Sequence, residues 1–314
     1  MKILVATDGS RGSAAAVRFA GDLASASRGR LTVVTVGETA PDVIAGAVVS
    51  GDLPPLERLE RRAARAALEK ARRETRRLSV PARLEYLASA RAQPFATAIA
   101  RSAMRRGADL IVVGNSGGRA LSRWILGSVS NRLVHAANRP VAVVRKWAPK
   151  ANRELFRIVV ATDGSRSAST AVRFAARLAS TIPKARLVIL TVSTLSADLA
   201  LTPPGFVRAL DLRPALDRAD RRAAEKILRD ATRQARLGRR ATVRYYKPAR
   251  RLFAADAILE EARREGADLI VLGRTGRSSF GDIVLGSVAR RVLALAGRPV
   301  ALVPRRPPKP KIRR

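Results

Sequence analysis

The sequence predicts an α/β protein of two similar domains, each a parallel sheet flanked by helices. Its 314 residues suffice for about two domains of ordinary size. The segment KILVATDGSRGSAAAVRFAGDLAS, which starts at Lys2, returns as RIVVATDGSRSASTAVRFAARLAS from Arg157. Within each copy, short β-branched runs alternate with longer stretches of helical period, a pattern typical of βαβ units. A repeat this long is a whole domain, so we interpret the chain as a tandem duplication.

Five strands are expected in each copy. Those of the first copy are Ile3–Ala6, Leu31–Val36, Ala82–Leu87, Leu110–Val113 and Val141–Val144. Those of the second copy are Ile158–Ala161, Leu187–Val192, Thr242–Tyr246, Leu269–Leu272 and Val300–Val303. Several of these runs are continuously apolar, which indicates strands covered by helices on both faces.

Helices are expected between the strands. In the first copy, Ser10 or Ser13 can cap the first helix, and the others cover Leu56–Arg77, Pro94–Arg106 and Ser128–Ala137. In the second copy they fall near Ser165–Ser180, Leu216–Leu237, Leu252–Glu265 and Ser287–Ala296. The predicted domains are residues 1–147 and 157–304, joined by a linker at 148–156. The proline-rich basic segment 305–314 is expected to be a disordered tail.

Composition limits the classes of function. The chain has no cysteine, which excludes disulfides, thiol nucleophiles and cysteine-ligated metals and fits a reducing compartment. No apolar run approaches the roughly 18 residues of a membrane helix, so we expect a cytoplasmic protein without a signal peptide or anchor. His135 is the single histidine, and no nucleophile–base–orienter set can be assembled. We therefore expect no catalytic residues, no protein metal site and no enzyme, although Asp8 and Asp163 could support slow metal-assisted hydrolysis.

The net charge is unusually high. The chain has 61 Lys and Arg against 25 Asp and Glu, which gives +36, and such a field attracts polyanions. Arginines form a stripe along the predicted helix 56–77, with Ala63 and Ala66 assigned to its apolar side. This stripe indicates either a contact with nucleic acid, nucleotide polyphosphate or anionic lipid, or a merely solvated face. Aromatic residues are only 4%, too few for a base-stacking platform, so nucleic-acid binding would rely on the phosphate backbone.

A spaced glycine pattern follows the fourth strand of each copy. It consists of Gly114 and Gly117, nine residues, then Gly127-Ser128; the second copy has Gly273 and Gly276, nine residues, then Gly286-Ser287. Glycines permit positive φ and a close approach to an anion, and the following helix presents free N–H groups and a favourable dipole. The pattern predicts a phosphate cradle, to which the Ser128, Ser130 and Ser287 hydroxyls could donate. The alternative is that the glycines serve turns and helix packing.

An aspartate ends the first strand of each copy. Asp8 and Asp163 both lie in the sequence Ala-Thr-Asp-Gly-Ser. Ligands of open parallel sheets bind beyond the carboxyl ends of the strands, at the point where the winding reverses. A carboxylate there could accept hydrogen bonds from a ribose or hold a phosphate-bound metal ion through water. Alternatively, the aspartate caps the first helix or closes the turn.

These motifs, together with the closing RPVAVV and RPVALV strands, resemble the universal stress protein family, and the resemblance covers both copies. It implies Rossmann-like, adenine nucleotide α-hydrolase-like domains with sheet order 3-2-1-4-5, of the branch that binds ATP. Mg²⁺ could accompany the phosphates. It further implies a stress-response or signalling role through an unknown protein partner, and closing strands that pair within the chain as a pseudo-dimer, with a homodimer also open. ATP, AMP and a cyclic nucleotide remain open as ligands.

The resemblance also assigns residues to the nucleotide. Thr7 and Asp8 would approach the ribose, and the backbone of Val36, at the end of the second strand, would meet the adenine. The implied phosphate residues of the first copy are Gly114, Gly117, Gly127, Ser128, Val129 and Ser130. The matching residues of the second copy are Thr162, Asp163, Val192, Gly273, Gly276, Gly286, Ser287 and Val288. Ala289 stands where the first copy has Ser130, and Arg274 where it has Asn115, so the two sites need not be equal.

Overall fold

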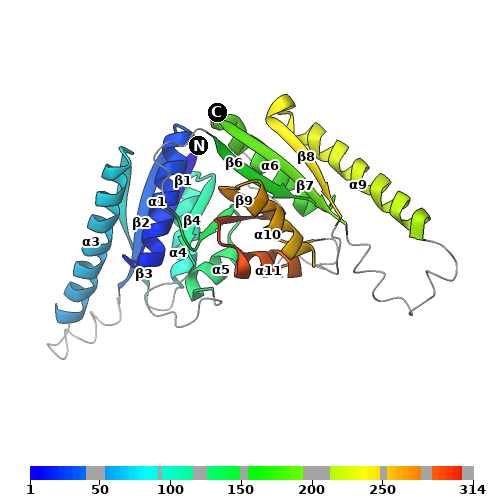
Figure 1. Cartoon of the computed structure of the whole chain (residues 1–314). Helices are drawn as coiled ribbons and strands as arrows, with labels where there is room; N and C mark the ends of the chain where they lie inside the picture. The colour runs from blue at the N-terminus through cyan, green and yellow to red at the C-terminus, as the bar shows by residue number, and fades with distance from the viewer. Residues whose placement is uncertain are drawn as a thin grey trace, which may run out of the picture. The chain divides into compact units, whose positions relative to one another are not determined.

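Two compact units make up the described part of the chain. The computed structural model describes residues 1–39, 54–90, 94–115, 126–148, 155–193, 213–247, 253–276 and 285–305. The units divide between residues 152 and 153. Each contains a five-stranded parallel sheet with helices on both faces (Figure 1). The predicted fold class is thus confirmed.

The first unit has the strand order β3-β2-β1-β4-β5. Its elements are β1 (Lys2–Ala6), α1 (Arg11–Ala26), β2 (Arg30–Thr39), α3 (Pro54–Arg77), β3 (Ala82–Ala90), α4 (Phe95–Arg106), β4 (Leu110–Gly114), α5 (Ser128–Ala136) and β5 (Val141–Val144). In the central strand, Ile3 pairs with Leu31 of β2 on one side and with Leu110 of β4 on the other. Helices α1 and α3 pack together on one face of the sheet, and α4 and α5 on the other (Figure 1).

The second unit repeats this arrangement in the order β8-β7-β6-β9-β10. Its elements are β6 (Phe156–Ala161), α6 (Arg166–Thr181), β7 (Ala185–Val192), α9 (Arg213–Ala235), a 3₁₀ turn (Gly238–Arg240), β8 (Ala241–Tyr246), α10 (Ala254–Arg264), β9 (Leu269–Gly273), α11 (Ser287–Leu295) and β10 (Val300–Val303). Helices α6 and α9 pack on one face, α10 and α11 on the other (Figure 1).

The cores are formed by strands covered on both faces. Ile3, Leu4 and Val5 are each at most 1% exposed, because consecutive side chains point to opposite, helix-covered faces. In α1 the buried Phe19 packs edge-to-face against Trp147, with ring centroids 5.0 Å apart. The Trp147 indole also donates a hydrogen bond of 2.7 Å to Asp22, which fixes the segment after β5 against α1.

The structure differs from the sequence expectations at several boundaries. Strand β2 continues to Thr39 because β3 runs beside it as far as Ala90. Strand β6 begins at Phe156, the last residue assigned to the linker, while linker residues 149–154 and tail residues 306–314 lie outside the described part. The assigned apolar side of α3 was wrong. Ala63 and Ala66 are exposed, whereas the buried alanines are Ala64, Ala67 and Ala71.

Within the described residues, no helix combines the length and the apolar character needed to cross a bilayer.

Candidate nucleotide site

The turn after the first strand of each unit holds the predicted aspartate. Asp8 Oδ1 accepts the Ser10 N–H at 3.0 Å, and Asp163 Oδ1 accepts the Ser165 N–H at 2.9 Å. Both turns need glycine as the next residue, since Gly9 and Gly164 have φ of +76° and +78°. The helix caps are the serines, not the aspartates. Each carboxylate therefore closes its turn with Oδ1 at the carboxyl end of the central strand.

Hydrogen bonds also set the charge state of Asp8. Partial burial raises the pKa of the Asp8 carboxyl, but hydrogen bonds from Ser10 and Ser13 outweigh this effect. The pKa of Asp8 consequently lies below its ordinary value of 3.8. The group is fully ionised at neutral pH and can accept hydrogen bonds or attract a cation.

Both threonines that precede the aspartates are buried. Thr7 Oγ1 accepts the Gly9 N–H at 3.1 Å, and Thr162 Oγ1 accepts the Gly164 N–H at 3.2 Å. Thr7 Oγ1 also lies 3.0 Å from Ser13 Oγ. The structure shows these hydroxyls shaping the turn, and their approach to a ribose stays a prediction.

The first glycine of each pattern is required for space. A Cβ on Gly114 would lie 2.8 Å from the carbonyl carbon of Gly12, and one on Gly273 would lie 2.6 Å from Ser167 Oγ. The ends of β4 and β9 therefore approach the first turns of α1 and α6 more closely than any side chain allows. Here the packing interpretation of the glycines applies.

Positive φ does not explain the described glycines of the pattern. The positive-φ glycines among the described residues are Gly9, Gly107, Gly164, Gly238 and Gly266. Gly127 and Gly286 instead have extended backbones, with φ of −60° at each. Gly117 lies outside the described residues.

The helix that follows each pattern begins without a side-chain cap. Gly127 and Gly286 are the N-cap residues of α5 and α11, and neither helix has a side-chain hydrogen bond at its cap. The Gly127 N–H donates to Asn115 O at 2.7 Å, and the Gly286 N–H to Arg274 O at 3.0 Å, which anchors each helix start to the preceding strand end. The first-turn amides, from Ser128 and Ser287 onward, carry the positive end of the helix dipole and are the donors that anions use.

In the second unit the acid, the loop and the helix start converge. The position of a Cβ on Gly276 lies 3.5 Å from Asp163 Oδ2, and that of a Cβ on Gly286 lies 3.3 Å from Gly276 N. Asp163, Gly276 and Gly286, which come from different parts of the chain, thus meet beyond the carboxyl ends of β6 and β9. The acid and the glycine motif of the second copy therefore lie side by side, while their contact with a nucleotide stays a prediction.

The predicted serine and valine positions differ in their surroundings. Ser128 and Ser287 are exposed at the first position of their helices, Val129 is half-buried and Val288 is 38% exposed. The buried Ser130 donates its hydroxyl proton to Gly114 O at 2.6 Å, so that proton ties α5 to β4. Ala289, the equivalent residue of the second copy, has no hydroxyl and cannot form this hydrogen bond. The difference between Ser130 and Ala289 therefore changes how the helix is held to its strand, in addition to any contact with a ligand.

The two valines assigned to adenine are placed differently in their strands. Val192 is the last residue of β7, but Val36 lies three residues before the end of β2, so its placement at a strand end was wrong. Leu190 O accepts the Thr162 N–H at 2.8 Å, while Ser193 N donates to Tyr246 O at 2.9 Å. Because backbone groups alternate in direction along a strand, those of Val192 point past the end of β6.

Sequence reasoning missed a polar cluster next to Val192. Asp220 Oδ2, on α9, accepts hydrogen bonds from Ser193 Oγ at 2.6 Å and from Tyr245 Oη at 2.5 Å. Burial and the hydrogen bond to Asp220 raise the pKa of Tyr245 to about 12. No local motif connects Ser193, which follows β7, with Tyr245 of β8 and Asp220 of α9; the register of β7 with β8 and the packing of α9 bring them together.

Comparison with known proteins identifies the family. A model of the universal stress protein family matches residues 1–145 and 155–304. The chain belongs to the universal stress protein family. A universal stress protein of Mycolicibacterium smegmatis is 33% identical over 96% of both chains. One of Methanocaldococcus jannaschii is 31% identical over 46% of this chain and 82% of its own. The crystal structure of an Archaeoglobus fulgidus universal stress protein, 20% identical, covers 97% of this chain and 98% of its own with a TM-score of 0.64, which supports the fold.

Proposed function

We propose that this universal stress protein binds ATP at the carboxyl ends of its two sheets and uses the nucleotide to control a protein interaction in stress response or signalling. The convergence of Asp163, Gly276 and the uncapped start of α11 carries this proposal. It offers an ionisable acid and helix N-terminal amides in one place, which is the combination that a sugar–phosphate ligand requires.

The residues present fit a nucleotide. The amides of the first turn of α11 would donate to phosphate oxygens, and Gly276 leaves room for them that a side chain would fill. Asp163 would accept hydrogen bonds from ribose hydroxyls or hold a phosphate-bound Mg²⁺ through water. The backbone of Val192 would meet the adenine edge. Within the described residues, no three His, Asp or Glu side chains group as a metal site, so a Mg²⁺ ion would depend mainly on the phosphates.

The first unit would bind through the equivalent Asp8 and the amides that follow Gly127. Its pattern has Asn115 where the second unit has Arg274, and both side chains are largely buried, at 6% and 8% exposed. An arginine adds a positive charge near the phosphates, so the second site is expected to bind the more highly charged nucleotide more tightly.

Calorimetry with ATP and Mg²⁺ tests the proposal through Gly276→Ala. Its Cβ meets Asp163 Oδ2 at an ordinary contact distance of 3.5 Å, so the fold should persist while the phosphate space is filled. We expect loss of one of two binding events. Gly297→Ala is the matched control, because a Cβ there meets nothing within 4 Å. ATP binding that Gly276→Ala leaves unchanged would refute this site. Parallel titrations with AMP and a cyclic nucleotide identify the preferred ligand.

We propose binding with weak or absent turnover, since the described residues of the site include no base–nucleophile pair. Phosphate release over hours tests this against slow hydrolysis. Release that exceeds the buffer rate and disappears when both Asp8 and Asp163 are changed to Asn would establish hydrolysis instead.

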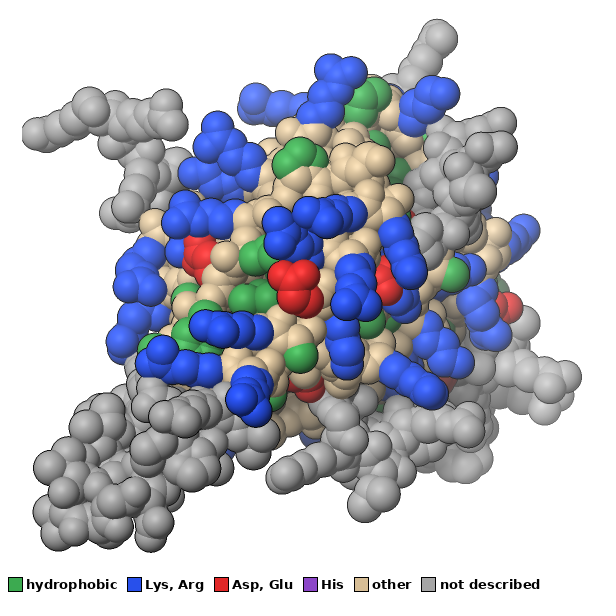
Figure 2. Space-filling view, turned by 90° about the vertical axis from the view of Figure 1, so that its left-hand side faces the viewer, with side chains coloured by type: hydrophobic (Ala, Val, Ile, Leu, Met, Phe, Trp, Pro, Cys, Tyr) green, Lys and Arg blue, Asp and Glu red, His purple; other side chains and the backbone are tan. Residues whose placement is uncertain are grey.

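A second candidate, nucleic-acid binding through the basic helices, rests on the surface charge. On the face where α3 lies, Lys and Arg side chains gather with few acids between them (Figure 2). Binding of this kind weakens steeply with salt and shows no adenine preference. Salt-resistant ATP binding favours the first candidate, and salt-abolished binding of any polyanion favours the second.

A further inference from the structure

A cationic groove runs between α6 and α9 of the second unit, away from the first turn of α11. It has a volume of about 830 Å³ and is lined by Arg173 and Arg177 from α6 and by Arg233 and Arg236 from α9 and its end. Asp230 and Gln234 line both this groove and a neighbouring cavity of about 430 Å³ that reaches the Asp163 turn. The two hollows therefore adjoin along α9, on the helix pair seen in Figure 1.

The duplicated chain supplies an internal comparison for this groove. In the first unit, Arg18 forms an ion pair of 3.3 Å with Glu74, and Asp22 accepts the Trp147 indole N–H. The repeat aligns Arg18 with Arg173 and Asp22 with Arg177. Helices α3 and α9 align through Ala67 and Ile227, which face the equivalent glycines of the first turns, so Gln234 stands where the first unit has Glu74.

Two of the replacements make the second groove more positive, and a third, Asp230 where the first unit has Lys70, offsets part of that gain. A carboxylate has become a neutral amide at Gln234, and another has become a guanidinium at Arg177. Arg173 donates to neutral groups, to Gln234 Oε1 across the groove at 3.5 Å and to Thr170 Oγ1 on its own helix at 3.0 Å. The Arg233–Asp230 ion pair is largely exposed, with side-chain exposures of 80% and 44%, and such pairs neutralise little.

The lining also indicates which anion fits. Arginine forks pair with two oxygens of a phosphate group, and four arginines line the groove. Among the described residues that line the groove there is no aromatic side chain and no histidine, so the groove has no aromatic platform for nucleobases. The volume is that of a small-ligand site. We propose that the α6–α9 groove binds a chain of inorganic phosphates, independently of nucleotide binding at the glycine pattern.

The test gives positions 177 and 234 the charges that the first unit has at the equivalent positions. Fluorescence anisotropy compares a labelled polyphosphate with a single-stranded oligonucleotide that has the same number of phosphates. Arg177→Asp lowers the net charge by two units and Gln234→Glu lowers it by one. We expect this double variant to bind polyphosphate about tenfold or more weakly. The slope of log affinity against log salt should fall by about one to two. Arg218→Asp with Arg222→Gln makes the same total change at exposed α9 positions outside the groove and should have a much smaller effect.

Two results would overturn the proposal. An equal loss in both double variants would show that bulk charge, and not the groove, holds the polymer. An oligonucleotide that binds as tightly and responds identically would make the groove a nucleic-acid site. Thermal unfolding checks both variants. If the double variant does not fold, Gln234→Glu alone, which is nearly isosteric and recreates the Arg18–Glu74 pair of the first unit, must still weaken polyphosphate binding and leave ATP binding unchanged.

Discussion

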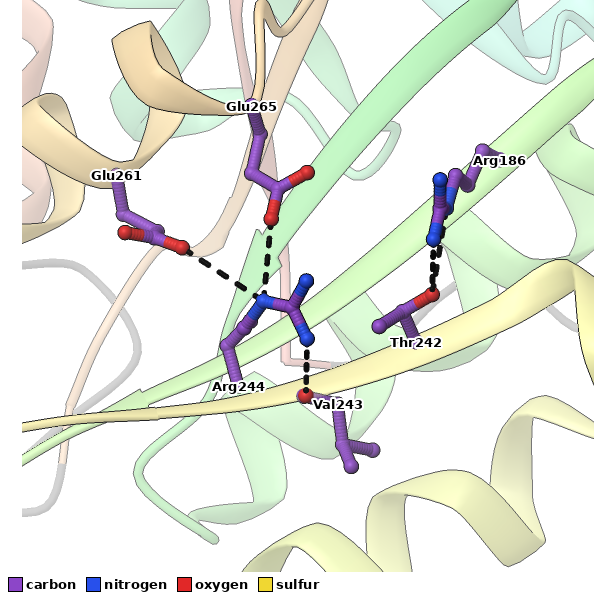
Figure 3. Close-up of polar contacts among 6 residues, drawn as sticks. All are labelled: Arg186, Thr242, Val243, Arg244, Glu261 and Glu265. Atoms are coloured by element: carbon purple, nitrogen blue, oxygen red, sulfur yellow. Dashed lines mark hydrogen bonds and ion pairs between the residues drawn. The ribbon is translucent and has the colours of Figure 1, made fainter.

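At the scale of single residues, the two units hold the same ion pair with its charges reversed. In the first unit, Glu85 of β3 pairs with Arg106 of α4. In the second unit, Arg244 of β8 places its Nε 3.9 Å from Glu261 of α10 and 3.2 Å from Glu265, the residue that caps the end of α10 (Figure 3). The positions correspond, because Glu85 pairs with Val34 in the sheet as Arg244 pairs with Leu190. By charge, β3 therefore pairs better with α4 than with α10, and β8 pairs better with α10 than with α4.

Arg244→Glu should destabilise the second unit by about 2–4 kcal/mol, because it breaks a partly buried pair and groups three carboxylates. Glu261 is the critical neighbour: its side chain is 4% exposed, and its Oε2 has no hydrogen-bond partner among the described residues. The first unit has Ser102 at this place, whose hydroxyl accepts from Arg106 Nε at 3.3 Å.

Urea unfolding provides the measurement for this charge reversal. The triple variant Arg244→Glu, Glu261→Ser and Glu265→Arg reproduces the arrangement of the first unit and should recover most of the lost stability. If the free energy of unfolding of Arg244→Glu lies within 0.5 kcal/mol of the wild-type value, the ordinary range of neutral surface changes, the ion pair contributes nothing to stability. A triple variant no more stable than the single one would show that the reversed pair is not interchangeable.

At the scale of elements, the close contact between the end of β9 and the first turn of α6 sets the position of the site. Gly273→Ala would bring its Cβ within 2.9 Å of Ala168 N and of the Ser167 carbonyl carbon, and within 2.6 Å of Ser167 Oγ. Backbone atoms cannot move aside as a side chain can. We therefore expect Gly273→Ala to lower the free energy of unfolding by about 1–3 kcal/mol and to weaken ATP binding as well. Gly276→Ala should instead weaken binding with little loss of stability.

Thermal unfolding and calorimetry of these two variants separate the architectural glycine from the ligand-facing one. If Gly273→Ala melts like wild type, the close approach is not tight in solution. If Gly276→Ala melts well below wild type, the variant is destabilised, and weaker ATP binding would not show that Gly276 leaves space for the phosphates.

The elements were predictable where a local pattern defines them. Apolar runs such as Leu110–Val113 and Val300–Val303 located strands because covered strands read as continuous apolar segments. The phase of α3 was not predictable, since Ala63, Ala64, Ala66 and Ala67 are chemically identical and only packing selects Ala64 and Ala67. The ends of β2 and β3 depend on each other through their register.

The candidate site, like the elements, was predictable where local sequence motifs define it. Asp163, Gly276 and Gly286 lie in short motifs at strand ends, and the parallel topology brings these ends together. That Gly273 is needed for close packing could be seen only in the structure, where its backbone lies against Ser167. The Ser193–Asp220–Tyr245 cluster was also not predictable, because it depends on the register of β7 with β8. Contacts between residues distant in sequence carry no local signal.

At the scale of the whole molecule, the net charge of +36 should oppose folding through self-repulsion. Salt screens this repulsion, since the Debye length falls from about 10 Å at 0.1 M to about 3 Å at 1 M. Local ion pairs such as Arg291–Asp256, at 3.1 Å, are weakened by the same screening. Because exposed pairs contribute little whereas the excess of positive charge is spread over the surface, repulsion should dominate.

We therefore expect the melting temperature to rise by about 5 °C between 0.1 M and 1 M NaCl, the shift that a gain of roughly 1–2 kcal/mol produces in domains of this size. Arg62, Arg65 and Arg76 on α3 are exposed, and changing all three to Gln lowers the charge without touching the core. This variant should melt higher than wild type at low salt and gain less from added NaCl, because it has less repulsion to screen. Scanning calorimetry across the salt series decides the matter: a wild-type melting temperature that falls with salt would mean that attractive pairs, and not the excess of arginine, govern the stability of the folded chain.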